Sequence, residues 1–360
     1  MAASTRRQPT NGAVKITASE TVERHAATVD ATADASAADL SHQIRLAASR
    51  IRPHIVETPL LPSPALSERT GAHVFLKLEN RQHTGSFKLR GATNRLLSLT
   101  AEERARGVVT ASTGNHALAV ARAAAQLQIT ATIYLPEDAS PRKIEKLKAF
   151  PVALRRVPGD ALNAEISARE AAVQSGRLFI SPYNDPHIIA GQGTIAVELL
   201  HQQPDLDAVF VTVGGGGLMG GIAGYLKASE PAVQTNGCQP ENSAVMLASV
   251  RAGRIVETES LPTLSDGSAG GIEAQTVTFD LCQRHVDHWL TVSEDEIAAA
   301  MRLIYHEIGE CIEGAAGVAV ASLLKMGNRV AGKRLAVVIC GGNVDTDTWQ
   351  QVLEQRKLGE

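Results

Sequence analysis

The segment "HTGSFKLRGATN" (residues 83–94) places Lys88 between Phe87 and Leu89, directly after a Thr-Gly-Ser turn and before an Arg-Gly pair. Most lysines keep the ammonium group in water, so a surface position is the ordinary interpretation of an isolated lysine. The alternative is a lysine that is held at the bottom of a binding site. The rest of the sequence decides between these two interpretations.

Short β-type segments alternate with helical segments along most of the chain. The predicted strands are 73–79, 107–112, 131–136, 152–157, 178–183, 208–214, 233–239 and 334–342. This alternation predicts an α/β fold, in which helices cover both faces of a parallel sheet. Ligands of such sheets bind beyond the carboxyl ends of the strands. Three of these ends run into glycines and small polar residues, so we expect one shared cleft there.

The chain length of 360 residues predicts two lobes, because a single hydrophobic core rarely grows this large. We expect a small lobe at residues 107–185 and a large lobe made of residues 41–106 and 186–360. Residues 1–40 are rich in Ala, Ser and Thr and offer little apolar surface. Burial of that surface cannot offset the entropy of ordering, so we expect a disordered leader.

The bulk composition excludes several classes of function. The net charge of −3 and the aromatic content of 3% give no basic surface and few stacking platforms, so no nucleic-acid partner is expected. No apolar run is long enough to cross a bilayer. The four cysteines are scattered without a CxxC pair, which is typical of reduced thiols in the cytoplasm.

Four consecutive glycines (Gly214, Gly215, Gly216 and Gly217) follow a predicted strand and precede a predicted helix. Glycine has no Cβ, so the backbone N–H groups of this tetraglycine run can approach a ligand closely. The partial positive charge of the helix start favours an anion, and phosphate is the natural occupant. The run matches neither a Walker loop nor a GxGxxG fingerprint, and an ordinary flexible loop is the alternative.

The segment "ASTGNHA" (residues 111–117) also lies at a predicted helix start. One interpretation is an ordinary N-cap around Asn115, because Ser, Thr and Asn side chains satisfy free backbone N–H groups there. The other is a loop whose Ser112, Thr113 and free N–H groups bind a small anion such as a carboxylate. We expect His116 to be structural rather than catalytic.

A lysine beside a phosphate-binding loop suggests a particular cofactor. A desolvated lysine amine has a lowered pKa and can attack an aldehyde. Pyridoxal phosphate (PLP) is a phosphorylated aldehyde that requires both a lysine and an anion cradle. Lys88 together with the tetraglycine run therefore predicts PLP as the cofactor.

The motifs "TGSFKLRGA", "STGNHA", "IAGQGTIAVELL", "VGGGGL" and "CGGNVD" resemble, in the same order, those of the fold-type II PLP enzymes. Within that group the sequence is similar to the serine/threonine dehydratase and serine racemase branch, because Leu-Arg follows Lys88 where cysteine synthases have Asp-Arg. The resemblance covers about residues 41–348. It implies a tryptophan synthase β-like fold, with two doubly wound α/β domains and an active-site cleft between them.

The resemblance also assigns cofactor contacts. Lys88 would carry PLP and, once released by the substrate, act as the general base for the Cα proton. Phe87 would pack beside the ring, Asn115 would hydrogen-bond the 3′-oxygen, and Cys340 would face the pyridine nitrogen as a neutral thiol. The tetraglycine run and the Leu218 amide would hold the phosphate. A small core residue at a strand end is the alternative interpretation of Cys340.

The substrate carboxylate would bind the loop from Ser112 to His116. The resemblance places Glu313 near the leaving group, although a carboxylate at a helix start is an equally good interpretation. Racemases of this branch have a serine on the far face of Cα, where this chain has Thr113. That difference favours elimination over racemisation.

Some relatives in the branch bind a divalent cation through a Glu and an Asp. The stretch "GCQPENSAVM" has Gln239 and Val245 at those places, which lack the anionic oxygens that Mg²⁺ prefers. We therefore expect no metal. The sequence stops soon after "CGGNVDTD", so we also expect neither the regulatory domain of the biosynthetic threonine dehydratases nor feedback control by isoleucine.

These observations predict a PLP-dependent dehydratase that converts an L-3-hydroxy amino acid to a 2-oxo acid and ammonia, with threonine and serine as the default substrates. A bulkier substrate remains open, such as phenylserine or the hydroxylated diamino acid from hydroxyectoine breakdown. A racemase and a non-catalytic regulator that binds PLP or an amino acid are further alternatives. We expect a homodimer or homotetramer in the cytoplasm.

Overall fold

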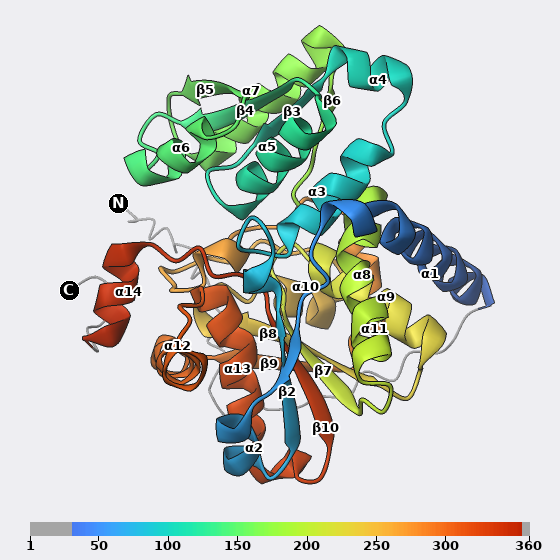
Figure 1. The fold of residues 1–360 in the computed structure, drawn as a ribbon, viewed down its shortest axis with the longest axis vertical. Coiled ribbons are helices and arrows are strands. Elements are labelled where there is room, and N and C mark those ends of the chain that lie inside the picture. Colours follow the sequence, from blue (N-terminus) through green and yellow to red (C-terminus); the bar gives the residue numbers. More distant parts are fainter. Residues whose placement is uncertain (1–30, 355–360) are drawn as a thin grey trace, which may run out of the picture.

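The computed structural model describes residues 31–354, and two separate sheets organise it (Figure 1). The larger sheet has six strands in the order β1-β2-β10-β7-β8-β9. These are β1 (Leu60–Pro62), β2 (His73–Leu78), β7 (Ala208–Thr212), β8 (Gln234–Pro240), β9 (His288–Val292) and β10 (Arg334–Ile339). Strand β1 is antiparallel to β2, and all other neighbours are parallel.

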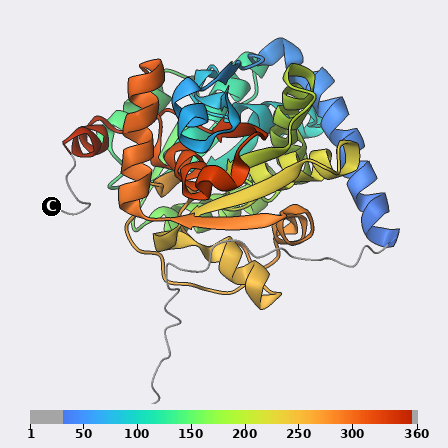
Figure 2. The ribbon, with the colours of Figure 1, turned by 90° about the horizontal axis from the view of Figure 1, so that it is seen from below.

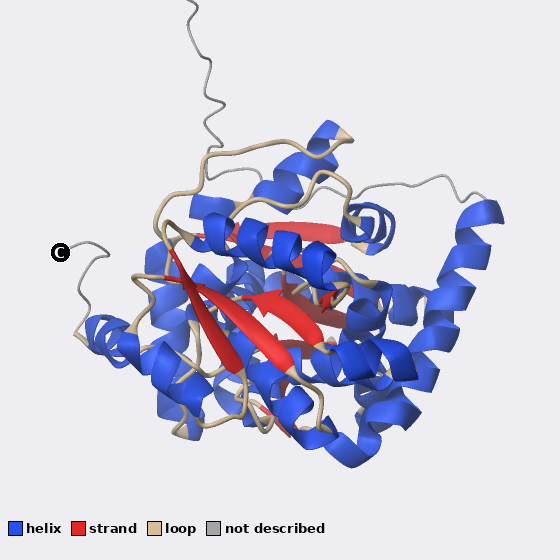
Figure 3. Cartoon of the chain, turned by 90° about the horizontal axis from the view of Figure 1, so that it is seen from above, coloured by secondary structure: helices blue, strands red, loops and turns tan. Residues whose placement is uncertain are grey.

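The smaller sheet has four parallel strands in the order β5-β4-β3-β6. These are β3 (Val108–Ala111), β4 (Ala131–Pro136), β5 (Ala153–Val157) and β6 (Leu178–Phe179). Helix α5 (Asn115–Leu127), α6 (Pro141–Lys148) and α7 (Ala161–Ser175) accompany it, and Figure 3 shows helices on both sides of its strands. The sheet lies within the range predicted for the small lobe, and the exact lobe boundaries remain a prediction.

Helices cover both faces of the larger sheet. Helix α1 (Ala31–Ile51), α8 (Pro186–Gln202) and α9 (Gly217–Ser229) pack together on one side, and α12 (Glu294–Ile308) packs with α13 (Gly314–Met326) on the other. In Figure 2, α1 (blue) and α12 (orange) flank the sheet at opposite edges of the view. The remaining helices are α2 (Pro64–Thr70), α3 (Lys88–Leu97), α4 (Ala101–Arg106), α10 (Val245–Ala252), α11 (Val277–His285) and α14 (Thr346–Leu353).

The hydrophobic core explains why the central strands are continuous aliphatic runs. All five residues of β7 are buried, as are all residues of β10 after Arg334. Helix α9 packs against β7 from one side, and α13 packs against β7 and β10. Strands covered on both faces cannot alternate apolar and polar side chains. This arrangement confirms the predicted α/β fold.

Each predicted strand is present, although 178–183 shortens to the two residues of β6. Two observed strands were not predicted: β1 has only three residues, and the edge strand β9 mixes polar and apolar side chains in "HWLTV". Helix α1 begins at Ala31 and therefore includes residues 31–40 of the predicted leader, whose boundary stays a prediction. The rest of the predicted leader, residues 1–30, lies outside the described part of the chain. No helix between residues 31 and 354 is long and apolar enough to cross a bilayer.

Candidate active site

A cavity of about 340 Å³ lies where β3, β7 and β10 end. Its wall brings together residues from both sheets, as expected for a site at the carboxyl ends of parallel strands. All of the site residues predicted from the sequence contribute to it: Phe87, Lys88, Ser112, Thr113, Asn115, His116, Gly214, Gly215, Gly216, Gly217, Leu218 and Cys340.

Lys88 is the first residue of α3, and its side chain points into this cavity. The Nζ atom donates a hydrogen bond to the carbonyl oxygen of Pro182 at 2.9 Å and lies 5.2 Å from the centre of the Phe87 ring. Burial lowers the pKa of Lys88 to about 8, although Cys340 and Glu313 act in the opposite direction. At pH 7 roughly a tenth of the amine is therefore uncharged, far more than for an ordinary lysine, and the uncharged form is the one that acts as a nucleophile or base.

The backbone before Lys88 is fixed to the end of β10. The Phe87 N–H donates to the Cys340 carbonyl at 3.1 Å, and Ser86 forms an isolated bridge with Gly341. Gly85 has a φ of 73°, a conformation that favours glycine. The Thr-Gly-Ser turn of the sequence therefore delivers Lys88 to the cavity from a strand end.

The tetraglycine run joins β7 to α9, which begins at Gly217 without a side-chain cap. Gly216 has a φ of 84°, and a Cβ on Gly215 would lie 2.5 Å from the Tyr183 ring. The tetraglycine run is thus closely packed against Tyr183, and all four glycines line the cavity. A helix start with bare backbone suits a phosphate group.

Asn115, Glu313 and Asn343 form a hydrogen-bonded cluster, in which Asn115 and Glu313 line the cavity. The Asn115 Nδ2 atom donates to both oxygens of Glu313 at 2.9 Å, and the Asn343 backbone N–H donates to Glu313 at 2.6 Å. Burial raises the pKa of Glu313, while the Asn115 amide opposes this effect. Gly114, and not Asn115, occupies the N-cap position of α5, so the ordinary N-cap interpretation of Asn115 is wrong.

The hydrogen bonds of the His116 imidazole indicate a structural role rather than contact with the substrate. Its Nε2 atom lies 3.0 Å from Thr110 Oγ1 and 3.1 Å from the Ile180 carbonyl oxygen. Burial lowers the pKa of His116 to about 3, with a smaller contribution from Lys88. The ring is therefore neutral and structural, and any contact of this residue with substrate would come from its backbone.

Cys340 is buried at the end of β10, and burial raises the pKa of its thiol, so the thiol is neutral. Gln239 lies away from the cavity wall, where its amide donates to the Val213 carbonyl and accepts from the Leu247 N–H. Val245 is buried in the core. Among residues 39–354, no group of three His, Cys, Asp or Glu side chains is placed to hold a metal ion, and the absence of a metal remains a prediction.

Sequence reasoning assigned no role to several residues in or beside the wall. Asn343 lies behind the wall, where it bonds Glu313 and Asn115, and it belongs to the "CGGNVD" motif. Asp266, Gly267 and Ser268 belong to a Gly/Ser-rich stretch, "SDGSAGG", that could have been noted beside the other glycine loops. Lys143 carries no local signal, because its sequence is that of an ordinary amphipathic helix.

Residues 51–341 match the family described as pyridoxal-phosphate dependent enzyme. The chain belongs to this family. Its cofactor is therefore PLP, and the structure fits it: a desolvated lysine amine and a bare helix start face one cavity, which also holds a neutral thiol.

Named relatives agree with this assignment. The chain is 42% identical over 301 residues to the L-threonine ammonia-lyase of Thermotoga maritima, which covers 83% of this chain and 74% of the relative. It is 36% identical over 298 residues to the β-hydroxyaspartate dehydratase of Paracoccus denitrificans, with 83% and 94% covered.

Two solved structures resemble this chain along most of its length. The processed form of threonine deaminase isoform 2 from Solanum lycopersicum has a TM-score of 0.88 at 31% identity, covering 96% of this chain and 99% of that one. Maize serine racemase has a TM-score of 0.81 at 31% identity, covering 87% and 96%. These similarities confirm the predicted fold-type II class and the dehydratase–racemase branch.

Proposed function

We propose that this PLP enzyme is an ammonia-lyase that eliminates water from an L-3-hydroxy amino acid, with threonine and serine as the default substrates. The position of Lys88 carries the proposal: its amine has a pKa of about 8 and lies in the same cavity as the tetraglycine run. The curated relatives named above are a threonine ammonia-lyase and a hydroxyaspartate dehydratase, which supports this reaction class.

The elimination would begin with removal of the Cα proton in this cavity. Bound PLP withdraws electrons from Cα, which makes its proton acidic. The Lys88 amine would take that proton, the Cβ–O bond would break, and the resulting Lys88 ammonium could pass its proton to the leaving hydroxyl, which departs as water. Hydrolysis of the released enamine gives the 2-oxo acid and ammonia.

Other groups would bind and orient the reactants. The tetraglycine run and the Leu218 N–H would hold the cofactor phosphate, and the Cys340 thiol would leave the pyridine nitrogen largely unprotonated. Glu313 accepts two hydrogen bonds of 2.9 Å from the Asn115 amide. These bonds would orient Asn115 for its proposed hydrogen bond with the 3′-oxygen of PLP. The loop from Ser112 to His116 would receive the substrate carboxylate.

A substrate with an acidic Cβ substituent, such as 3-hydroxyaspartate, is a second candidate. Lys143 contributes a cation to the cavity wall. Its Nζ atom lies 3.8 Å from Asp266 and 3.6 Å from Asp345, so neither carboxylate makes a short hydrogen bond that a substrate carboxylate would have to break. The variant Lys143→Met should then lower kcat/KM for 3-hydroxyaspartate about tenfold, the effect of losing one charged contact.

One experiment tests the reaction and ranks the substrates. The purified holoenzyme is incubated separately with L-threonine, L-serine, L-phenylserine and L-threo-3-hydroxyaspartate, while 2-oxo acid and enantiomeric composition are followed together. The proposal expects 2-oxo acid from at least one of them. Accumulation of the D-amino acid with little oxo acid would identify a racemase instead, and no turnover of any compound would favour a regulator.

A further inference from the structure

Arg90 and Lys77 are the largest side chains that are completely buried between residues 39 and 354. Both carry a charge, and neither lines the PLP cavity. Arg90 is the third residue of α3, two positions after Lys88. A buried cation so close to the reactive lysine requires a physical reason.

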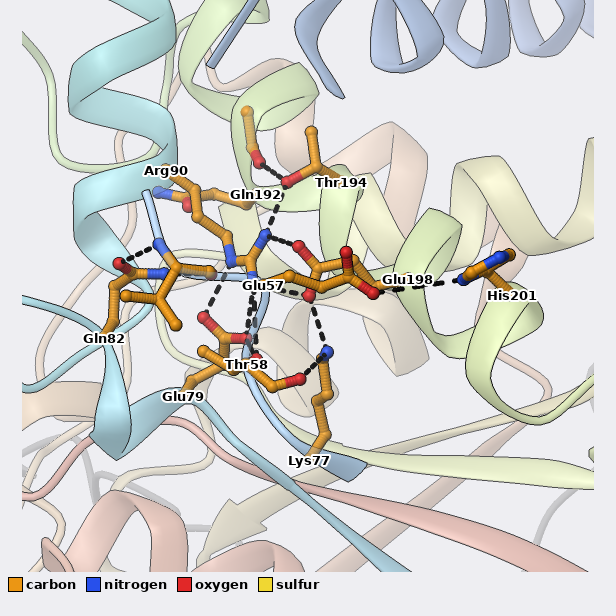
Figure 4. Close-up of polar contacts among 12 residues, drawn as sticks. Glu57, Thr58, Lys77, Glu79, Gln82, Arg90, Gln192, Thr194, Glu198 and His201 are labelled. Atoms are coloured by element: carbon orange, nitrogen blue, oxygen red, sulfur yellow. Dashed lines mark hydrogen bonds and ion pairs between the residues drawn. The ribbon is translucent and has the colours of Figure 1, made fainter. Parts of the chain in front are cut away.

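The Arg90 guanidinium is held by two carboxylates at once (Figure 4). It donates to both oxygens of Glu79 at 2.8 Å, and to the two oxygens of Glu198 at 2.6 and 2.8 Å. Thr194 Oγ1 accepts a further bond at 3.2 Å and Thr58 Oγ1 another at 3.3 Å. The planar fork of an arginine suits two such bidentate contacts, and a lysine cannot reproduce them.

Lys77 completes the network on the side away from α3. Its Nζ atom donates to Glu198 at 2.6 Å, to the Thr58 carbonyl at 2.7 Å and to Gln202 at 2.9 Å. Burial lowers the pKa of Lys77, whereas Arg90 and Lys77 lower the pKa of Glu198 despite its burial. The network therefore contains two cations, Lys77 and Arg90, and two anions, Glu79 and Glu198, so its net charge is zero.

The network joins parts of the chain that are distant in sequence. Lys77 comes from β2, Glu79 from the short helix η2 (Glu79–Arg81), Arg90 from α3 and Glu198 from α8. Buried ion pairs commonly stabilise a fold no better than apolar side chains of the same volume, because removing the charges from water costs so much. Stability alone is therefore a weak reason for such a network, and the exact position of α3 is a stronger one.

The first turn of α3 is held in place by contacts with other elements rather than by a cap of its own. Its N-cap residue, Phe87, makes no side-chain capping bond. Next to Arg90, the Gly91 N–H donates to Gln192 of α8 at 3.1 Å, and a Cβ on Gly191 would lie 2.6 Å from the Gly91 Cα. Arg90 and Gly91 together hold the start of α3 directly against α8.

We infer that Arg90 is a positioning residue: through Glu79 and Glu198 it fixes the first turn of α3 and thereby the place of the Lys88 amine in the cavity. This inference rests on the role proposed for Lys88. Misplacement by about 1 Å can cost up to about a hundredfold in rate even when the altered residue never touches the substrate.

The test compares holoenzyme variants with wild type. Arg90→Lys keeps the charge and removes the fork, and Glu198→Gln removes one charge at a partly accessible position. Arg95→Lys is the matched control, because Arg95 is also on α3 and pairs with Asp185 at 2.8 Å, away from the network. Three properties are measured: the rate of PLP loss on dialysis, kcat and KM, and the melting temperature.

Arg90→Lys should lose PLP about tenfold faster and reduce kcat about tenfold, with KM within about threefold. Glu198→Gln should show about a threefold effect in the same direction, because Glu79 still binds Arg90. For Arg95→Lys, the rate of PLP loss and kcat should both stay within about twofold of wild type, even if its melting temperature falls as much as that of Arg90→Lys.

Values within about twofold of wild type for Arg90→Lys, or for Glu198→Gln if the first variant does not fold, would overturn the inference. Lys88→Ala separates this failure from that of the proposed function. If the visible band of lysine-bound cofactor persists in Lys88→Ala, the role of Lys88 is wrong. If the band is lost there while Arg90→Lys behaves as wild type, only the positioning role is wrong.

Discussion

The side-chain amide of Asn343 donates to Asn115 Oδ1 at 2.7 Å and to the Thr84 carbonyl at 2.8 Å. One asparagine thus ties the start of α5, beside the small sheet, to the segment that delivers Lys88 from the large sheet. The same residue donates its backbone N–H to Glu313. The geometry of the cavity therefore depends on a residue that the cofactor chemistry alone would not point to.

Replacing Asn343 with Ala should lower kcat about tenfold and destabilise the fold by about 1–3 kcal/mol, because polar partners are left unsatisfied in a partly buried site. Steady-state kinetics and thermal unfolding measure the two effects. Asn328→Ala is the control, since Asn328 is exposed and its replacement should change stability by less than about 0.5 kcal/mol. Equal behaviour of the two variants would contradict the role of Asn343.

The lowered pKa of Lys88 predicts how pH affects stability in the PLP-free protein. The pKa is about 8 in the folded state against 10.5 as the ordinary value. Between these values the unfolded chain binds a proton that the folded chain does not, so the contribution of Lys88 to stability rises with pH across this window. Below about pH 8 the buried ammonium destabilises the fold.

Lys88→Met should therefore raise the melting temperature of the PLP-free protein at pH 7, by about 3 °C. The gain should shrink as the pH approaches 10. Calorimetry of both proteins over this range measures the difference. A difference that stays constant with pH would show that the Lys88 amine is not desolvated.

Thr113 is expected to limit reprotonation of Cα on the far face. Its branched side chain is stiff at χ1, so the hydroxyl is not free to turn toward Cα. In wild type, 2-oxo acid should form at least about tenfold faster than the enantiomer, a barrier difference of about 1.4 kcal/mol. Thr113→Ser should raise the share of racemised product from L-serine, measured by chiral chromatography. An unchanged ratio would remove Thr113 from this role.

Chelation should have little effect on turnover. The Gln239 amide is engaged with Val213 and Leu247, and the Val245 side chain is apolar and buried. Activity in excess EDTA should stay within about twofold of the value in Mg²⁺, since neither residue offers an anionic oxygen. A large loss that Mg²⁺ restores would show that other residues bind a metal.

Much of the fold could be predicted because buried parallel strands are aliphatic runs that end in glycine or small polar residues. Strands β7 and β10 show this pattern clearly, and both lead into the cavity. The edge strand β9 could not be found in this way, since half-exposed side chains such as His288 and Thr291 interrupt its apolar pattern.

The candidate site was predictable where local sequence sets the backbone, as in the tetraglycine run or the turn before Lys88. It was not predictable where function depends on packing between distant segments. Arg90 and Lys77 have the sequence appearance of surface cations, and only the folded chain shows that Glu79 and Glu198 surround them. Lys143 similarly reaches the cavity from a helix of the small sheet.

The central claim is that Lys88 carries the cofactor. Reduction of the holoenzyme with borohydride, followed by proteolysis and mass spectrometry, locates the lysine to which PLP becomes irreversibly attached. We predict the added mass of reduced PLP on the peptide that contains Lys88, with loss of activity in proportion to labelling. Attachment to a different lysine, or full inactivation without any label on Lys88, would contradict the account.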